Sequence, residues 1–168
     1  MPLITSDVHA ADSGVVIPFI NDVPSLADFS GMRPESQLAR SMSKIENFIQ
    51  REPDDGVPAS QRTEVYLGYN EENLYSIFLA FDDEPEQIRS SLTSRENFDG
   101  DDNVQLTIDT FNNQISAYVF RVNPNGIQWD ARWTESSSFR RSSFDTSLEA
   151  VWESEGQITD QGYMVRMV

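Results

Sequence analysis

A hairpin signal in the second half of the chain constrains its fold more than any other feature. Two runs with the composition of strands, residues 115–122 and 127–133, flank the tetrapeptide Asn-Pro-Asn-Gly at positions 123–126. An Asn-Gly pair adopts the positive φ angles of tight β-turns at little cost. The pattern therefore predicts two antiparallel strands joined by a short turn.

Further strands are predicted on both sides of this hairpin. Residues 63–69 and 104–108 alternate between apolar and polar side chains, as half-buried strands do. Residues 74–81 are apolar almost throughout, which indicates a strand covered on both faces. The last two strands are expected at 148–152 and 163–168, joined by a region with a glycine-containing turn.

Many short strands with hairpin spacing and little helix predict an all-β fold, an antiparallel β-sandwich of the jelly-roll or immunoglobulin-like kind. One or two short helices accompany it. Pro34 suits a first helical position and good helix formers follow as far as Met42, while a helical turn or two is expected within 85–92. Residues 135–143 are rich in Ser and Arg and are expected to form a mobile loop.

The length of 168 residues suits one domain with a substantial core. Residues 1–30 are interpreted as an N-terminal arm, in which Pro18 reduces the apolar patch at 15–20 to an edge strand or extended segment. Residues 31–168 then form the sandwich. Because the last expected strand stops at Val168 without a turn or cap, we expect this domain to be truncated at its C-terminal end.

Charge and rare residue types exclude several functions. Asp and Glu number 28 against 12 Lys and Arg, which gives a net charge of −16. This argues against nucleic acid, which needs clustered basic residues, and against adsorption to anionic membranes. No signal peptide or membrane-inserting segment is visible. The chain has no cysteine, and its one histidine, His9, lies in the arm, which argues against a Ser-His-Asp triad.

The strands of the hairpin carry the candidate ligand-binding residues. Arg121 stands in an otherwise apolar strand, and a buried guanidinium is costly unless it is paired or bound to something. Trp129 and Trp133 fall on one face of the following strand. They form either a flat platform for a polysaccharide or part of the core, and the sequence leaves both interpretations open.

An acidic turn precedes the strand at 104–108. Asp99, Asp101 and Asp102 are crowded around Gly100. Calcium takes several oxygen ligands from such loops, which makes these residues a candidate calcium site. The alternative is a solvated acidic turn, or an aspartate that caps a neighbouring strand or helix.

The order of motifs resembles a known family. Phe-Asp-Asp-Glu-Pro at 81–85, Asp-Asp-Asn-Val at 101–104 and Val-Asn-Pro-Asn-Gly at 122–126 are similar to motifs of family 9 carbohydrate-binding modules. The similarity covers about residues 45 to 168. The similar modules stand at the N-terminus of exported bacterial proteins with a long β-rich C-terminal region, which resembles an outer-membrane barrel.

The resemblance implies site residues, partners and a location. The family's acidic ligand corresponds to Gln105 and its arginine ligand to Arg121, while Phe98 is the aromatic residue nearest to its first tryptophan. The second tryptophan would lie beyond Val168. The implied partners are a saccharide and the C-terminal region of the same protein, in the periplasm, at the outer membrane or outside the cell.

Three functions follow as hypotheses. The first is a non-catalytic carbohydrate-binding module that targets a larger exported protein. The second is an interaction domain that docks on the C-terminal region without binding sugar. The third is part of a glycoside hydrolase, although nothing singles out a catalytic carboxylate pair among the 28 acids.

Overall fold

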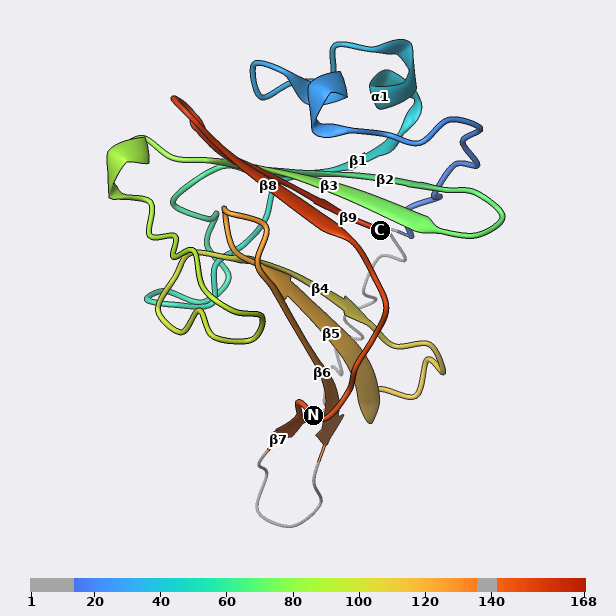
Figure 1. Cartoon of the computed structure of the whole chain (residues 1–168), viewed down its shortest axis with the longest axis vertical. Coiled ribbons are helices and arrows are strands. Elements are labelled where there is room, and N and C mark those ends of the chain that lie inside the picture. Colours follow the sequence, from blue (N-terminus) through green and yellow to red (C-terminus); the bar gives the residue numbers. More distant parts are fainter. Residues whose placement is uncertain (1–13, 136–141) are drawn as a thin grey trace, which may run out of the picture.

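A computed structural model describes residues 14–135 and 142–168, and it shows two antiparallel β-sheets packed face to face (Figure 1). The larger sheet has five strands in the order β1-β2-β3-β9-β8, and the smaller has four in the order β4-β5-β6-β7. This confirms the predicted all-β sandwich. The strands of the larger sheet are β1 (Ser43–Ile45), β2 (Thr63–Tyr69), β3 (Leu74–Phe81), β8 (Ser154–Thr159) and β9 (Gly162–Met167). Those of the smaller sheet are β4 (Val104–Ile108), β5 (Ser116–Val122), β6 (Gln128–Glu135) and β7 (Ser142–Asp145).

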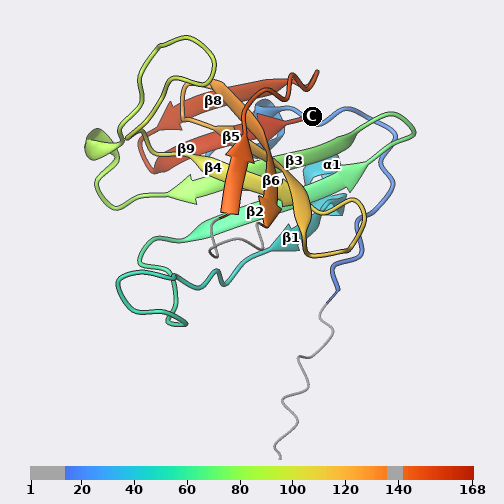
Figure 2. The same cartoon turned by 90° about the horizontal axis from the view of Figure 1, so that it is seen from below.

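The first part of the core lies between the two sheets. Seen from below, β4, β5 and β6 lie over β2, β3 and β9 (Figure 2). Alternate residues of these strands point into the space between them, and each large apolar side chain buried there contributes about 1.5–3 kcal/mol. The buried members of this cluster are Val65, Leu67, Phe78, Ala80, Val104, Val122, Tyr163, Val165 and Met167.

The second part of the core covers the other face of the larger sheet. A 3₁₀ turn η1 (Leu26–Phe29) and a short helix α1 (Gln37–Ser41) lie there (Figure 1). Strand β3 is therefore covered on both faces, as its apolar sequence predicts. The buried members of this second cluster are Ile20, Leu26, Phe29, Met32, Ala39, Met42, Tyr66, Tyr75, Ile77, Leu79 and Met164.

This layer corrects two expectations about the N-terminal part. Ile20, Leu26 and Phe29 belong to the core, so residue 30 does not separate an arm from the domain. The helix begins at Gln37 and not at Pro34, because the Ser36 side chain accepts the Ala39 N–H and acts as the N-cap.

The Asn-Pro-Asn-Gly turn forms as predicted and has a further contact. The N–H of Gly126 donates to the carbonyl of Asn123 over 2.9 Å, and Gly126 has a φ of 83°. The turn lies directly against Gly156 of β8, where a Cβ atom would stand 2.4 Å from the carbonyl oxygen of Pro124. The hairpin of the smaller sheet is thus packed on the edge strand of the larger one.

The C-terminal part differs most from the expectations. Residues 148–152 form no strand but an extended crossover between the sheets, and the strand before β9 is β8, in the region expected to turn. Strand β7 was not predicted; of the expected loop 135–143, residues 136–141 lie outside the described part. Only a short 3₁₀ turn, η2 (Pro85–Gln87), forms within 85–92. Within the described residues, no helix has the length and hydrophobicity needed to cross a bilayer.

Candidate functional site

The outer face of the smaller sheet gathers four of the sequence-predicted site residues. The strand registers place Gln105 of β4 opposite Arg121 of β5, and Arg121 opposite Trp129 of β6. Their neighbours Val104 and Val122 point into the core between the sheets, so this row points away from it. Trp133 lies on the same outer face, four residues after Trp129. Residues from three different strands therefore form one surface.

Arg121 is held in this row by an amide and two aromatic rings. Its Nε donates to Gln105 Oε1 over 2.7 Å, and its guanidinium carbon lies 4.4 Å from the centroid of the Trp129 ring. The Phe144 ring of β7 is 5.4 Å away. No carboxylate among the described residues forms an ion pair with Arg121. Stacking on aromatic faces stabilises this half-buried cation in place of a counter-ion.

A groove of about 440 Å³ lies beside Arg121 on the same face. Its floor contains Ala117 and Val119 of β5, whose small side chains keep the surface low between the neighbouring strands. Trp133 stands opposite Ala117 and next to Phe144, so two aromatic residues form one wall. The remaining lining residues are polar and are Gln105, Thr107, Asp109, Gln114 and Ser116.

The polar wall is fixed by its own hydrogen bonds. Gln105 uses its carbonyl oxygen for Arg121 and donates from Nε2 to Thr107 Oγ1 over 3.0 Å. The Asp109 carboxylate accepts the N–H groups of Phe111, at 3.0 Å, and Gln114, at 2.7 Å. The wall thus presents amide, hydroxyl and carboxylate groups in set positions across from aromatic rings.

The two tryptophans have different roles on this surface. Neither belongs to the buried clusters of the core, which decides against the core interpretation that the sequence left open. One face of Trp129 is covered by Arg121, and its ring forms a T-shaped pair with Phe144 at a centroid distance of 5.7 Å. Trp133 lines the groove itself. The structure therefore offers Trp133, more than Trp129, as the aromatic platform.

Phe98 is not part of this surface. It lies in the loop before β4, where it is 8% exposed, and it does not line the groove. An aromatic ring that is buried elsewhere cannot stack on a ligand bound beside Arg121.

The aspartates of the acidic turn hold neighbouring segments of the fold together by hydrogen bonds. The Asp101 carboxylate accepts hydrogen bonds from the N–H and hydroxyl of Ser91 and from the Asn123 amide, and Asp102 accepts the N–H of Arg89. Partial burial alone would raise the pKa of Asp101, but these hydrogen bonds outweigh it and lower the pKa. In the described part of the chain, no three acidic or histidine side chains gather in a way that could hold a metal ion, and Asp99, Asp101 and Asp102 are no exception.

One buried carboxylate went unnoticed in the sequence. Asp130 of β6 is fully buried, pairs with Arg95, and accepts the Nε1–H of Trp152 and the N–H of Ala150, each at 3.1 Å. The sequence signal that could have revealed this residue is an aspartate that lies between two tryptophans within a predicted strand. Its contacts are with the crossover and the loop before β4, so it supports the smaller sheet from its inner side.

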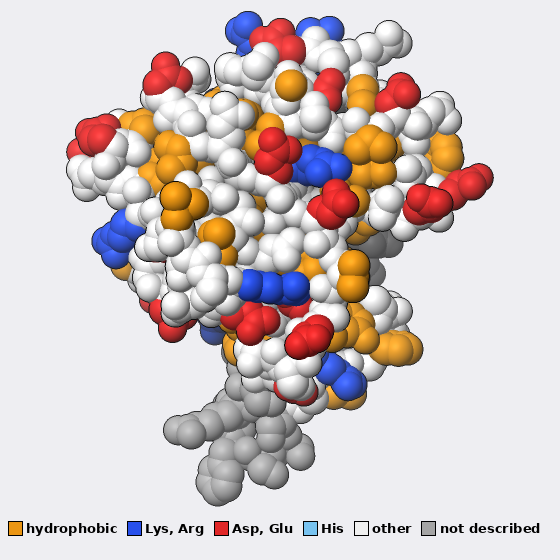
Figure 3. Space-filling view, viewed as in Figure 1, with side chains coloured by type: hydrophobic (Ala, Val, Ile, Leu, Met, Phe, Trp, Pro, Cys, Tyr) orange, Lys and Arg blue, Asp and Glu red, His pale blue; other side chains and the backbone are white. Residues whose placement is uncertain are grey.

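The surface charge agrees with the composition. Acidic side chains are scattered over the face shown in Figure 3, and the described Lys and Arg side chains there stand apart from one another. The described residues of this face thus form no basic patch of the kind that a polyanion requires.

Comparisons with known proteins do not assign this chain to a family or a function. No protein-family model, curated protein sequence or solved structure gives a significant match to this chain. Its function must therefore be inferred from its own geometry.

Proposed function

We propose that this domain is a non-catalytic carbohydrate-binding module that targets a larger exported protein to a saccharide. The observation that supports this proposal is the groove on the smaller sheet. There the aromatic wall of Trp133 and Phe144 faces the polar wall of Gln105, Thr107 and Asp109. Sugar rings need this combination, since their C–H faces pack on aromatic rings and their hydroxyls bond to amide or charged groups.

Arg121 defines one end of the proposed site. Its Nε–H donates to the side-chain oxygen of Gln105, and its stacking on Trp129 fixes the plane of the guanidinium. A fixed guanidinium presents its other N–H groups in a set geometry, which favours a bidentate bond to neighbouring ligand oxygens. Arg121 thus supplies donors, while Asp109 and Thr107 supply acceptors.

The electrostatics favour a neutral saccharide. The chain carries a net charge of −16, and Asp109 lies in the groove wall. A polyanionic glycan would meet repulsion here, whereas a neutral glycan would not. We therefore expect binding to uncharged polysaccharides or oligosaccharides.

The test is retention of the purified chain in gels containing neutral polysaccharides, followed by calorimetry with oligosaccharides of the retained type. Trp133→Ala and Arg121→Ala should each weaken binding at least tenfold, which corresponds to about 1.4 kcal/mol. The matched controls are Arg132→Ala, an exposed arginine on the other face of β6, and Phe111→Ala, an exposed aromatic outside the groove. Failure of every glycan to retain the folded chain would remove the proposal, and sugar release from the panel would indicate a hydrolase instead.

A second candidate is the interaction domain. Strand β8 is at the edge of the larger sheet, and Ile158 within it is 44% exposed. Edge strands accept added strands from partners through main-chain hydrogen bonds. This candidate predicts that Ile158→Lys abolishes association with the C-terminal region of the full-length protein, measured by co-purification, and that glycan binding is absent.

A further inference from the structure

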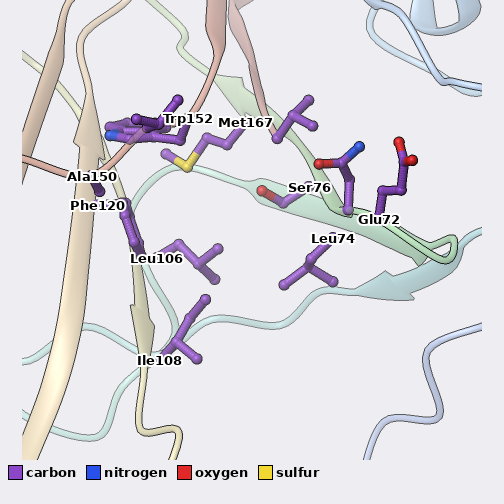
Figure 4. A pocket seen from close by; sticks show the side chains of 12 residues that line it. Glu72, Leu74, Ser76, Leu106, Ile108, Phe120, Ala150, Trp152 and Met167 are labelled. Carbon is purple, nitrogen blue, oxygen red and sulfur yellow. The ribbon is translucent and has the colours of Figure 1, made fainter.

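A cleft between the two sheets forms a second cavity, distinct from the groove. It has a volume of about 240 Å³ and opens at one end of the sandwich, near the turn between β2 and β3. Figure 4 shows side chains of both sheets and of the crossover pointing into it. Its apolar lining is Leu74, Leu106, Ile108, Phe120, Ala150, Val151, Trp152, Met167 and Val168.

The aromatic wall of this cleft is rigid. Trp152 donates its Nε1–H to the buried Asp130 over 3.1 Å, and its ring contacts Phe120 edge to face at a centroid distance of 5.2 Å. The indole is therefore fixed from both sides, and it does not need to move to admit a small molecule.

One polar group inside the cleft has no partner. Ser76 of β3 is 1% exposed and lines the cavity, and its Oγ makes no hydrogen bond to any described residue. Its neighbours along this face of β3 are apolar, namely Leu74 and Phe78. A buried hydroxyl without a partner is destabilising, and a ligand group that bonds to it would remove this cost.

We propose that this inter-sheet cleft binds a small, uncharged, mainly apolar molecule whose single hydroxyl bonds to Ser76 Oγ. The site lies on the inner side of the smaller sheet, opposite the groove, so it does not rest on the proposed sugar binding. Among the described residues that line the cleft, Glu72 alone is charged, and it is exposed at the opening. A carboxylate there, in a chain with a net charge of −16, disfavours an anionic ligand such as a fatty acid.

The size of the cleft limits the ligand further. An apolar cavity of about 150 Å³ holds benzene, and drug-sized ligands occupy about 300–1,000 Å³. A volume of 240 Å³ lies between these. The expected ligand is therefore a substituted single ring or a short-chain alcohol.

The experiment is a ¹⁹F NMR titration of the whole chain with two probes of nearly equal shape, 4-fluorobenzyl alcohol and 1-ethyl-4-fluorobenzene, in which a methyl group replaces the hydroxyl. Both should bind saturably, because both fill the apolar cleft. Ser76→Ala should weaken binding of the alcohol about fivefold and leave binding of the ethylbenzene unchanged, since only the alcohol bonds to the hydroxyl. This difference is a readout that a merely structural role of Ser76 would not produce.

A second variant tests the location. Leu74→Trp places a large ring at the cleft opening and should abolish binding of both probes. Leu92→Trp makes the same exchange at a site that is 85% exposed and outside the cleft, and it should bind as the parent chain does. Absence of saturation by either probe would overturn the proposal, and so would an equal effect of Ser76→Ala on both. If Leu74→Trp does not fold, the comparison of the two probes in Ser76→Ala decides alone.

Discussion

The fold stabilises the charges of Arg121 and Glu64, two side chains that are partly or fully buried, in different ways. Arg121 is stabilised by aromatic rings and one amide, without a described counter-ion. Glu64 of β2 is 5% exposed and is surrounded by partners. Its carboxylate accepts the hydroxyl of Tyr66 at 2.8 Å and pairs with Lys44 at 2.8 Å and Arg62 at 3.2 Å. The first arrangement leaves donors free for a ligand, whereas the second satisfies the charge internally.

The pKa values of the second group follow from these contacts. Burial alone would raise the pKa of Glu64, but the hydrogen bonds from Lys44 and Tyr66 outweigh it and lower the pKa below 4.5. Burial, followed by the bond to Glu64, raises the pKa of Tyr66 to about 12. A carboxylate with a lowered pKa stabilises the fold above the pKa of the unfolded chain, and this stabilisation is lost as the pH falls toward the folded pKa.

Replacing Glu64 with Gln should therefore have an effect that depends on pH. At pH 7 we expect a loss of about 2 kcal/mol of unfolding free energy, because a buried, charged hydrogen-bond acceptor is removed. Below the ordinary pKa of 4.5 the difference should shrink, because the carboxyl group of the parent chain becomes protonated too. Urea unfolding at several pH values measures it. Glu35→Gln, in the exposed pair with Arg33, should change stability by less than about 0.5 kcal/mol, and a difference for Glu64 that does not vary with pH would contradict this account.

At the scale of elements, the hydrophobic pattern of the sequence predicted those strands that bury apolar side chains on one or both faces. Strands β2, β3, β4, β5, β6 and β9 have alternating or continuous apolar residues, and each forms where that pattern indicated. Strand β8 has a polar sequence, Ser154–Thr159, because it is an exposed edge strand that needs few buried side chains. Residues 148–152 look more like a strand, yet the backbone of Ala150 and Trp152 bonds to side chains of Arg95, Asp130 and Gln128. Such long-range bonds leave no local signal in the sequence.

The candidate site, like the strands, could be predicted from the sequence only in part. The hairpin register and the period of two place Arg121 and Trp129 side by side, and β4 adds Gln105. Phe144 was missed because β7 follows a Ser- and Arg-rich segment that resembles a loop. The groove itself depends on small residues, Ala117 and Val119, between larger ones, and that contrast appears only once three strands are aligned.

The contact between the hairpin turn and β8 gives a test at this scale. Gly156→Ala should destabilise the fold by about 2 kcal/mol, because the added methyl would lie 2.4 Å from two backbone atoms, Gly126 N and Pro124 O, which cannot rotate away. Thermal unfolding measures the loss. Gly14→Ala, where no atom lies within 4 Å of the new methyl, should leave the melting temperature equal to that of the parent chain within the error of the measurement. An equally stable Gly156→Ala chain would show that β8 does not pack against the turn so closely.

At the scale of the whole molecule, the smaller sheet separates the two proposed binding surfaces, which differ in chemistry. Its outer face carries the groove with aromatic and polar walls, and its inner face closes one side of the apolar cleft. Alternation along the strands is what allows this, because successive residues of β4 and β5 serve opposite faces. Gln105 and Arg121 point outward, while Leu106 and Phe120 line the cleft.

The excess of acidic residues also acts on the molecule as a whole. With 28 acids and 12 bases, the folded chain brings like charges closer together than the unfolded chain does, which lowers its stability at neutral pH. Salt screens this repulsion, so raising NaCl from about 20 mM to about 300 mM at pH 7 should raise the melting temperature by roughly 3 °C. Near the sequence pI of 4.2 the net charge disappears, and the same addition should have little effect. Calorimetry at both pH values measures the difference. MgCl₂ and CaCl₂ at equal ionic strength serve as further arms. If screening is the cause, the two salts stabilise equally, whereas an extra rise with calcium would indicate specific calcium binding and contradict a purely electrostatic origin.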